Sequence, residues 1–476
     1  MTSMADTLFQ VFDVESRWLF DGEKRLDASF YAKDVIASKI LMGNLEESGI
    51  KIQTIDSMSK IFHRSRFKRK YVDIGKGLPF LTPTDLFMFP LKPRKSVVNP
   101  PEGLQVSPEW ILVTCSGTVG RTIVSNKFIS PCVLSHDVIR TIPKNGNLFG
   151  YLYAYLNTWV GQAFLTKDQY GATVKHIEPH HMANIPIPRV PELEERINQK
   201  ILEAHRLREE AQEYLLKAEE MLYSELGLPR IYESDVEYFG GENGRIIKSF
   251  AIKASELNLR LDASYHLPMI RQIEKYLVEI NMDVQPIGDK IDSIFIPPRF
   301  KRPYAKSHAD GVRYIRPSDL PLIKHFESRY LARTFKNCDL YRLKEGEILV
   351  VTDGTIGWVS IVTPLIAGWY GSNNFARIVL TEDLDSGYLL AYLLSPYGQY
   401  QLKREIFGGV IDHLTEDHIR QIKIPVPTEK MQKMIGKLVI EAYIKKDEAN
   451  QIEDEAIELL ERRLKEIADH PNRPVI

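Results

Sequence analysis

The 476-residue sequence is poor in cysteine: its three cysteines, Cys115, Cys132 and Cys338, form no C-x-x-C pair. This number and spacing exclude a disulfide framework and a cysteine-based zinc site. No run of about 18 apolar residues occurs, and the N-terminal MTSMADTLFQVFD lacks the basic-then-apolar pattern of a signal peptide. We therefore expect a protein that spans no membrane and resides in a reducing cytoplasm.

The chain also lacks an excess of either charge, because 62 Lys and Arg residues face 63 Asp and Glu residues. Any case for a nucleic-acid partner must therefore rest on where the basic residues lie. The hydrophobic share of 44% and the charged share of 26% are ordinary for a globular protein. The length exceeds the roughly 250–300 residues at which single cores stop growing, so more than one domain is expected.

What the sequence does contain is an internal repeat, with an offset of 235 to 238 residues between most matching segments. The matching segments are RLDAS at 25–29 and 260–264, ILV followed by a GTVG or GTIG turn at 111–120 and 348–357, GYLYAYLNTWVGQ at 150–162 and GYLLAYLLSPYGQ at 387–399, and YGATVKHIEPHHMANIPIP at 170–188 and FGGVIDHLTEDHIRQIKIP at 407–425. Each copy therefore predicts strand-like apolar runs, a short helix (150–165 and 387–402), a proline-rich stretch and then a long helix.

The two long helices are predicted from heptad spacing. One row of small apolar residues occurs in each copy at seven-residue steps: Ile197, Ala204, Ala211 and Ala218, and Ile435, Ala442, Ala449 and Ala456. A second row is Leu193, Leu207, Tyr214 and Met221, and Met431, Leu438, Ile452 and Leu459, with Lys200 and Lys445 interrupting. Small residues at this period predict a helix pair with a close backbone approach. The alternative is two unrelated amphipathic helices, each packed in its own domain.

The repeat also predicts the domain organisation. We expect an N-terminal extension (1–24), a first repeat domain (25–191), a central long helix (192–226), a connector (227–259), a second repeat domain (260–428) and a C-terminal long helix (429–468). The fold class is α+β, with the two domains joined by the helix pair.

Basic residues cluster at matching positions of the two copies. HRSRFKRK at 63–70 contains Arg64, Arg66, Lys68, Arg69 and Lys70, and PPRFKRPYAK at 297–306 contains Arg299, Lys301, Arg302 and Lys306. In a chain of nearly zero net charge, two matched clusters indicate two equivalent contacts with anions, and the phosphates of a DNA duplex are the natural candidate. The alternative is a solvated basic loop.

Short polar residues beside the G-T-V/I-G turns differ between the copies, whereas the turns themselves match. The candidates for hydrogen bonds to base edges are Ser116, Thr118 and His136 in the first copy and Asp353, Thr355, Asn373 and Asn374 in the second, with Arg316, Arg140 and Arg377 as further candidates. Two domains that recognise different DNA sequences would show this pattern, although ordinary sequence divergence in loops would produce it as well.

No catalytic motif occurs in either copy. Asn99-Pro100-Pro101 is followed by Glu102, where adenine-N6 methyltransferases place an aromatic residue that stacks on the flipped base. His176 and His181 recur as His413 and His418, and their setting favours packing or the start of a helix over a metal site. A phosphate-binding G-x-x-x-x-G-K-S/T loop is absent. We expect no catalysis and no metal in this chain.

The order of these motifs, repeated twice over residues 25–468, resembles the specificity subunit of Type I restriction–modification systems. The resemblance implies two target-recognition domains that each read half of a bipartite DNA site, and two long helices packed as an antiparallel coiled coil. It implies double-stranded DNA, two methyltransferase subunits and motor/endonuclease subunits as partners. The chain itself would carry no cofactor, whereas the methyltransferase would use S-adenosylmethionine and the motor ATP and Mg²⁺.

The helix lengths agree with a spacer role, since 33 residues at 1.5 Å span about 50 Å, or on the order of 15 base pairs. The sequence departs from the family where the helices begin: Pro191-Glu192-Leu193-Glu194 and Thr428-Glu429-Lys430-Met431 stand in place of a Pro-x-x-x-Gln-x-x-Ile run, and only Gln432 retains part of it. We predict that the chain is a non-catalytic DNA-recognition subunit that directs adenine-N6 methylation and restriction by its partners. The alternatives are a coiled-coil assembly scaffold that reads no DNA sequence and a self-sufficient nuclease or methyltransferase.

Overall fold

A computed structural model describes residue 16 and residues 28–144, 149–171, 173–232, 235–236, 238, 249–257, 259–408 and 412–469. The expected N-terminal extension (apart from residue 16), the first three residues of the RLDAS motif at 25–29 and residues 233–234, 237, 239–248 and 258 of the connector lie outside the described residues. None of the described helices is long and apolar enough to cross a membrane.

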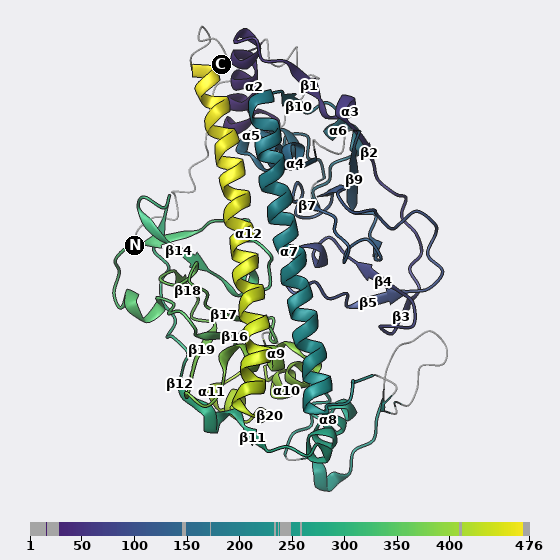
Figure 1. The fold of residues 1–476 in the computed structure, drawn as a ribbon, viewed down its shortest axis with the longest axis vertical. Helices are drawn as coiled ribbons and strands as arrows, with labels where there is room; N and C mark the ends of the chain where they lie inside the picture. The colour runs from purple at the N-terminus through teal and green to yellow at the C-terminus, as the bar shows by residue number, and fades with distance from the viewer. Residues whose placement is uncertain are drawn as a thin grey trace.

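Two long helices run side by side through the middle of the molecule (Figure 1). They are α7 (Pro191–Leu226) and α12 (Glu429–Asp469). Pro191 occupies the first turn of α7, where its missing N–H costs nothing, and Gly227 ends the helix in the left-handed conformation. All eight residues of the predicted small-residue row are at most 1% exposed. The helices therefore approach along the alanine-rich faces.

Ion pairs between the helices show that they are antiparallel. Arg463 pairs with Glu192 at 3.0 Å, Lys200 with Glu455 at 2.7 Å and Lys445 with Glu210 at 2.7 Å. Each step along α7 is thus matched by an equal step backwards along α12. The two lysines that interrupt the second predicted row therefore link one helix to the other.

The structure buries the second predicted row only in part. Tyr214, Met221 and their counterparts in α12 are half-buried. A neighbouring row is buried instead, because each helix packs against the flanking domains as well as against the other helix: Ile201, Leu215, Leu222, Val439 and Leu460. The same row contains Arg208 in α7 and Lys446 and Glu453 in α12. A search for apolar residues at helical spacing does not find these three, because their side chains are charged.

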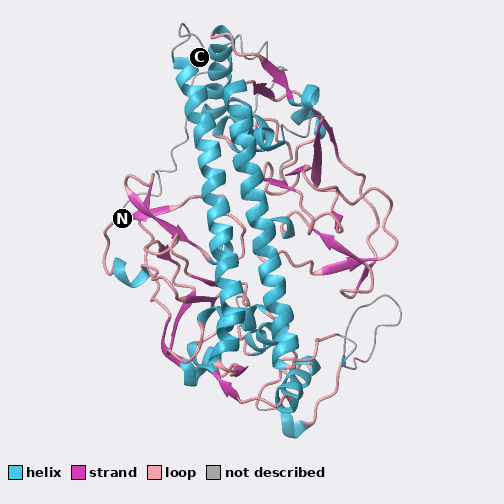
Figure 2. Ribbon diagram, viewed as in Figure 1, coloured by secondary structure: helices cyan, strands magenta, loops and turns pink. Residues whose placement is uncertain are grey.

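The first unit, residues 28–190, lies on one side of the helix pair (Figures 1 and 2). Its sheets have the strand orders β1-β10, β2-β9-β6-β7 and β3-β5-β4-β8. The strands are β1 (Ile52–Thr54), β2 (Ser59–Phe62), β3 (Tyr71–Val72), β4 (Leu78–Leu81), β5 (Lys95–Val97), β6 (Ile111–Thr114), β7 (Thr122–Val124), β8 (Val133–Leu134), β9 (Val138–Pro143) and β10 (Pro186–Pro188). The helices are η1 (Ala28–Tyr31), α2 (Lys33–Glu47), α3 (Ile55–Met58), η2 (Asp85–Phe87), α4 (Phe149–Asn157), α5 (Trp159–Thr166) and α6 (Pro179–Ala183).

The second unit, residues 249–428, lies on the other side and repeats this topology (Figure 1). Its sheets have the orders β11-β20, β12-β19-β16-β17 and β13-β15-β14-β18. The strands are β11 (Val284–Pro286), β12 (Ile291–Phe295), β13 (Tyr304–Ala305), β14 (Gly311–Ile315), β15 (Tyr330–Ala332), β16 (Ile348–Val351), β17 (Val359–Ile361), β18 (Tyr370–Gly371), β19 (Phe375–Leu380) and β20 (Lys423–Pro425). The helices are η5 (Ala254–Glu256), α8 (Pro268–Glu279), η6 (Ile287–Lys290), η7 (Pro317–Asp319), η8 (Cys338–Tyr341), α9 (Ser386–Leu394), α10 (Pro396–Arg404) and α11 (Glu416–Arg420).

The repeated tyrosine and proline motifs contact one another. Tyr151 and Tyr155 on α4 donate hydrogen bonds to the carbonyls of Pro188 and Pro186 at 2.5 and 2.6 Å. In the second unit, the equivalent tyrosines of α9 donate to the carbonyls of Pro425 and Lys423. Because a proline-rich strand has few N–H donors and keeps its carbonyls, buried hydroxyls are suitable partners for it.

The structure corrects two helix predictions. The single helices expected over 150–165 and 387–402 are each broken into two, because Thr158 accepts a hydrogen bond from the N–H of Gly161 as a new N-cap and Pro396 starts α10. Helices α2 and α8 occupy stretches where strand-like runs were expected. In α2, the buried residues Val35, Ser38, Met42 and Leu45 follow helical spacing.

Each unit builds its core on both long helices. The core of the first unit combines Leu193 and Ile197 of α7 with Leu460 and Leu464 of α12. The core of the second unit combines the C-terminal half of α7 with the N-terminal half of α12. Both helices are therefore integral to both units.

A buried cluster of charges lies midway along the helix pair. Glu453 of α12, which is 1% exposed, pairs with Arg208 of α7 and with Lys324 of the second unit, both at 2.6 Å. Tyr153 of α4 donates a hydrogen bond to the same carboxylate at 3.0 Å. Burial alone would raise the pKa of Glu453, but Arg208 and Lys324 outweigh burial and lower it to about 2. One carboxylate thus joins both helices and both units.

The close approach of α9 to α12 predicts an unusual response to alanine. In Gly436→Ala, the new Cβ would overlap the Oδ1 of Asp385, which caps α9 by accepting from the N–H of Tyr388. Alanine should gain about 1 kcal/mol of helix propensity, but losing the cap and overpacking the contact cost more. We expect a net loss of about 2 kcal/mol in the free energy of unfolding, measured by denaturant titration.

The control is Gly43→Ala in α2, where a Cβ meets no atom within 4 Å. Gly43→Ala should leave stability unchanged or raise it by up to about 1 kcal/mol. Equal responses of the two variants would contradict the assigned contact.

Candidate nucleic-acid interface

Two exposed basic loops occupy equivalent places in the two units. The first (residues 63–70) links β2 to β3, and the second (residues 296–303) links β12 to β13. Besides Arg302, the basic Arg and Lys side chains exposed to solvent are Arg64, Arg66, Lys68, Lys70, Arg299, Lys301 and Lys306, the last of which lies just past β13. Among the described residues, no carboxylate lies within 4.0 Å of these seven cationic groups, so their charges are free to meet an external anion.

The remaining arginine of each loop, Arg69 or Arg302, anchors the loop to the unit behind it. Arg69 donates to Ser135 Oγ at 3.1 Å and contacts His136 Nδ1 at 3.2 Å, and its guanidinium lies over the ring of Phe80. Burial lowers the pKa of His136, with Asp137 opposing and Arg69 adding to the shift, and a neutral imidazole can accept from Arg69.

The second unit repeats this anchor with different side chains. Arg302 donates to Tyr314 Oη at 2.8 Å and to Asn373 Oδ1 at 3.1 Å. Asn373 is 6% exposed, and its amide also donates to Asn374 Oδ1 at 2.6 Å. The structure therefore brings the basic loop and the predicted polar residues together in both units. The contacts of Arg69, Arg302 and Asn373 hold the loops in place.

The turns at Ser116–Thr118 and Asp353–Thr355 present exposed threonines beside these anchors. Thr118 and Thr355 are exposed, whereas Ser116 and Asp353 are half-buried. The N–H of Gly117 donates to the Lys175 carbonyl at 3.1 Å, and the Asp353 carboxylate contacts the ring of His413. An open cavity of about 340 Å³ lies beside the first turn and is lined by Pro83, Thr84, Phe87, Thr114, Ser116, Gly117, Thr118, Arg121 and Asp137 of the first unit and by Leu322 of the second.

Three further arginines serve the protein itself. Arg140 is fully buried and donates to the carbonyls of Val138 and Leu104, and burial lowers its pKa to about 10. Arg377 is 7% exposed and pairs with Glu347 at 2.6 Å. The expectation that these two contact bases is wrong, because both side chains are buried and their guanidinium groups bond to the protein itself. Arg316 pairs with Asp319 at 2.6 Å and with Glu327 at 3.4 Å.

The recurring histidines pack and start helices, as expected. The ring of Tyr170 lies 5.8 Å from that of His176 and 5.9 Å from that of His181. His181 Nδ1 accepts the backbone N–H of Glu178 at 3.0 Å, which closes the capping box of α6. Phe407, His413 and His418 repeat these contacts. Within the described ranges, no group of three or more His, Cys, Asp or Glu side chains is arranged to hold a metal ion.

Comparison with known proteins gives a family and several solved structures. The family of the Type I restriction modification DNA specificity domain matches the chain twice, over residues 48–207 and 296–459, which together exceed half its length. The chain is similar to the Type-I restriction-modification system S subunit from M. genitalium (11% identity, TM-score 0.35, 89% of this chain and 94% of that one). It is also similar to the HsdS subunit from Thermoanaerobacter tengcongensis (14%, 0.27, 90% and 97%). No curated protein matches it significantly.

Proposed function

Since the chain belongs to the family of Type I restriction modification DNA specificity domains, we propose that it is the non-catalytic subunit that recognises a bipartite DNA site for a Type I restriction–modification complex. Residues 25–191 and 260–428 act as the two target-recognition domains. The helices at 192–226 and 429–468 hold them apart, and residues 227–259 connect the two halves of the chain.

The observation that carries this proposal is the pair of exposed basic loops at equivalent positions of the two repeats. Arg64, Arg66, Lys68 and Lys70 of the first loop, and Arg299, Lys301 and Lys306 of the second region, have no ion-pair partner in the described part of this chain, whose net charge is −1. Basic side chains bind DNA phosphates favourably because counterions are released, but these contacts carry no sequence information. The loops therefore grip the backbone of each half-site, with Arg69 and Arg302 fixing their positions.

Base reading falls to the polar side chains next to the anchored loops. Ser116, Thr118 and His136 serve the first half-site, and Asp353, Thr355 and Asn374 serve the second, with Asn373 and Arg316 acting mainly as supports. Hydroxyl, amide and carboxylate groups suit the donor and acceptor pattern of the major groove. Because Ser116 and His136 have different counterparts in the second unit, Asp353 and Asn373, the two half-sites should have different sequences.

The chemistry belongs to partner subunits that dock on this chain. Two methyltransferase subunits using S-adenosylmethionine modify adenine N6, and motor/endonuclease subunits using ATP and Mg²⁺ cut unmodified DNA. Adenine methylation across the host genome, compared with this gene intact and deleted, tests the assignment. One motif made of two short blocks with a fixed gap should disappear on deletion. An unchanged set of motifs would contradict the proposed function and favour the coiled-coil scaffold.

Charge reversal tests the role of the loops on the duplex that this comparison identifies. Lys68→Glu with Lys301→Glu should weaken binding at least tenfold at moderate salt and reduce the slope of log K against log salt by about 2, because each lost phosphate contact contributes about 0.9. Binding is measured for the assembled methyltransferase complex by fluorescence anisotropy over a series of salt concentrations.

The matched control is Lys51→Glu with Lys423→Glu. Both control lysines are exposed, and they lie next to or within the equivalent two-stranded sheets β1-β10 and β11-β20. This pair changes the net charge equally but should leave both affinity and salt slope within twofold of the original. If the two double variants behaved alike, general charge rather than the loops would govern binding.

A further inference from the structure

The two units contact each other directly through segments that occupy equivalent positions in the two repeats. Met88 of the first unit and Leu322 of the second form an antiparallel bridge. The N–H of Phe89 donates to the Pro321 carbonyl, and the N–H of Ile323 donates to the Phe87 carbonyl, both at 2.8 Å. PTDL at 83–86 aligns with PSDL at 317–320, so Met88 and Leu322 are equivalent residues. An approximate two-fold axis therefore passes through this bridge.

Aromatic side chains on either side of the bridge insert into the opposite unit. Phe89 joins the core that contains the strands of the second unit, where its ring lies 5.2 Å from that of Tyr443. Phe326 of the second unit packs against the first unit, with its ring 5.2 Å from that of Phe87 and 4.8 Å from the guanidinium of Arg121. The exchange is reciprocal, so neither unit can shift along the bridge without uncovering an aromatic ring.

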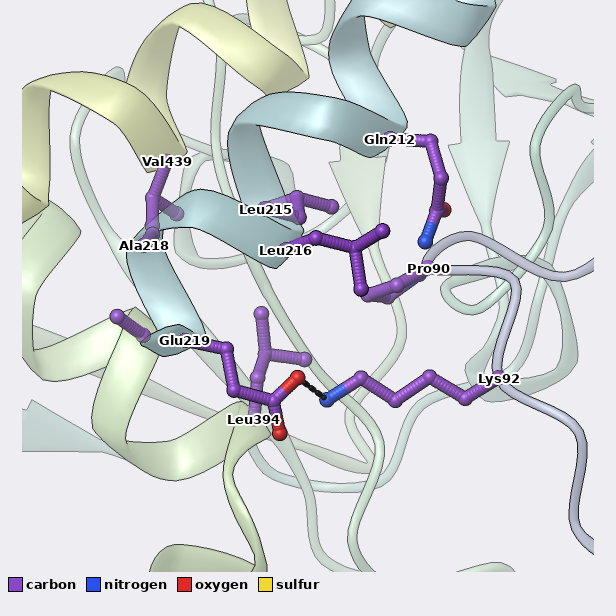
Figure 3. A pocket seen from close by; sticks show the side chains of 10 residues that line it. Pro90, Lys92, Gln212, Leu215, Leu216, Ala218, Glu219, Leu394 and Val439 are labelled. Carbon is purple, nitrogen blue, oxygen red and sulfur yellow. Dashed lines mark ion pairs between the residues drawn. The ribbon is translucent and has the colours of Figure 1, made fainter. Parts of the chain in front are cut away.

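Amide side chains of the long helices hold both crossing segments. Gln212 of α7 accepts the N–H of Leu91 at 2.9 Å and donates to its carbonyl at 3.3 Å. Asn450, its counterpart in α12, donates to the Ile323 carbonyl at 2.9 Å. Figure 3 shows Pro90 beside Gln212 of α7, and Lys92 reaching Glu219 of the same helix, with which it pairs at 2.8 Å. The charged cluster at Glu453 adds Lys324 from the next position of the second segment.

We propose that this junction, made of segments 87–91 and 321–326 with Gln212 and Asn450, is a second determinant of the gap between the half-sites, alongside the length of the helices. The inference rests on the proposed function. The helices fix how far apart the units are attached, whereas the junction fixes how each unit is turned about its attachment. Gln212 and Asn450 are thus positioning residues that do not touch DNA.

The size of one base-pair step explains why the junction matters. Adding one base pair moves a half-site by about 3.4 Å and turns it by about 35°, since a helical turn of 34–36 Å holds 10–10.5 base pairs. A relative displacement of that size would break both 2.8 Å hydrogen bonds of the bridge. With the junction intact, a duplex with the wrong gap must either be bent and twisted or lose contact at one half-site. With the junction loosened, the units can adapt.

The test compares duplexes that carry the native bipartite site with the native gap and with gaps one base pair shorter or longer, bound by the assembled methyltransferase complex. The original chain should prefer the native gap at least tenfold. Gln212→Ala with Asn450→Ala should reduce that preference to threefold or less and leave the affinity for a single half-site within twofold. The control, Gln199→Ala with Gln451→Ala, removes exposed amides from the same helices and should keep the preference.

A structural role alone would lower the unfolding temperature and leave the gap preference unchanged, and that result would overturn the inference. If the double variant does not fold, Phe326→Ala loosens the same junction at a half-buried position and is judged by the same preference. A different result would contradict the proposed function: the original chain would bind no bipartite duplex better than a scrambled one. If the double variant folds and keeps the original tenfold preference for the native gap, only the proposal about the junction is contradicted.

Discussion

Glu453→Ala is expected to lower the free energy of unfolding by about 3–5 kcal/mol, because removing one partner of a buried ion pair leaves the charge of the other partner buried and uncompensated. The variant would remove the carboxylate partner of Arg208 in α7, would leave Lys324 of the second unit with only its pair to Asp454 at 2.6 Å, and would leave the Tyr153 hydroxyl without its acceptor. Denaturant unfolding measures the loss. Because the carboxylate joins both helices and both units, we expect the whole chain to lose stability together.

The matched control lies two residues further along the same helix. Glu455 pairs with Lys200 at 2.7 Å, but its side chain is 63% exposed. Solvent screens such a pair, so Glu455→Ala should cost less than about 1 kcal/mol. A loss below 1 kcal/mol for Glu453→Ala as well would mean that water reaches the cluster and that burial does not govern its energy.

The same carboxylate should make the protein sensitive to acid in a defined range. Its pKa is lowered from 4.5 to about 2 in the folded chain. A carboxyl group with a lowered folded pKa contributes stability at pH values above its unfolded pKa, and this contribution is lost as the pH falls through the folded pKa. The window therefore runs from about pH 4.5 down to about pH 2, and the contribution is about 3 kcal/mol for a shift of this size.

Other carboxyl groups titrate in this range, so the measurement is a difference. Glu453→Gln keeps an acceptor for Tyr153 and removes the charge. The gap in unfolding free energy between the original chain and Glu453→Gln should be largest above pH 5 and should shrink steadily towards pH 2. A constant gap over that range would show that Glu453 is not responsible for the acid response.

Periodicity made the architecture predictable from the sequence. The repeat offset predicts two equivalent units, and the alanines at seven-residue steps predict the face along which α7 meets α12. The break between α4 and α5 escaped prediction because Thr158 ends one helix by capping the next. Arg208, Lys446 and Glu453 escaped it because a search for apolar rows ignores charged residues. Only partners brought together by the tertiary fold make these residues suitable for burial.

The candidate interface was predictable in part. The basic loops stand out by composition, and the structure leaves most of their charges exposed. The sequence cannot distinguish Arg69, which anchors the loop, from Lys68, which has no ion-pair partner among the described residues, because the difference depends on Ser135 and His136. Arg140 was misjudged for a similar reason, since its carbonyl partners at Val138 and Leu104 are set by chain packing. The contact between Met88 and Leu322 joins equivalent residues across an axis that no local pattern reveals.

The antiparallel arrangement of α7 and α12 has a consequence for synthesis of the chain. The last part of α12 to leave the ribosome, around Leu460 and Leu464, completes the core of the unit that is made first. At about 5–20 residues per second, the roughly 200 residues between the two helices take on the order of tens of seconds to translate. During that time the first unit has an open face. A premature stop shortly before Leu460 would therefore damage the N-terminal unit more than the C-terminal unit beside it in sequence.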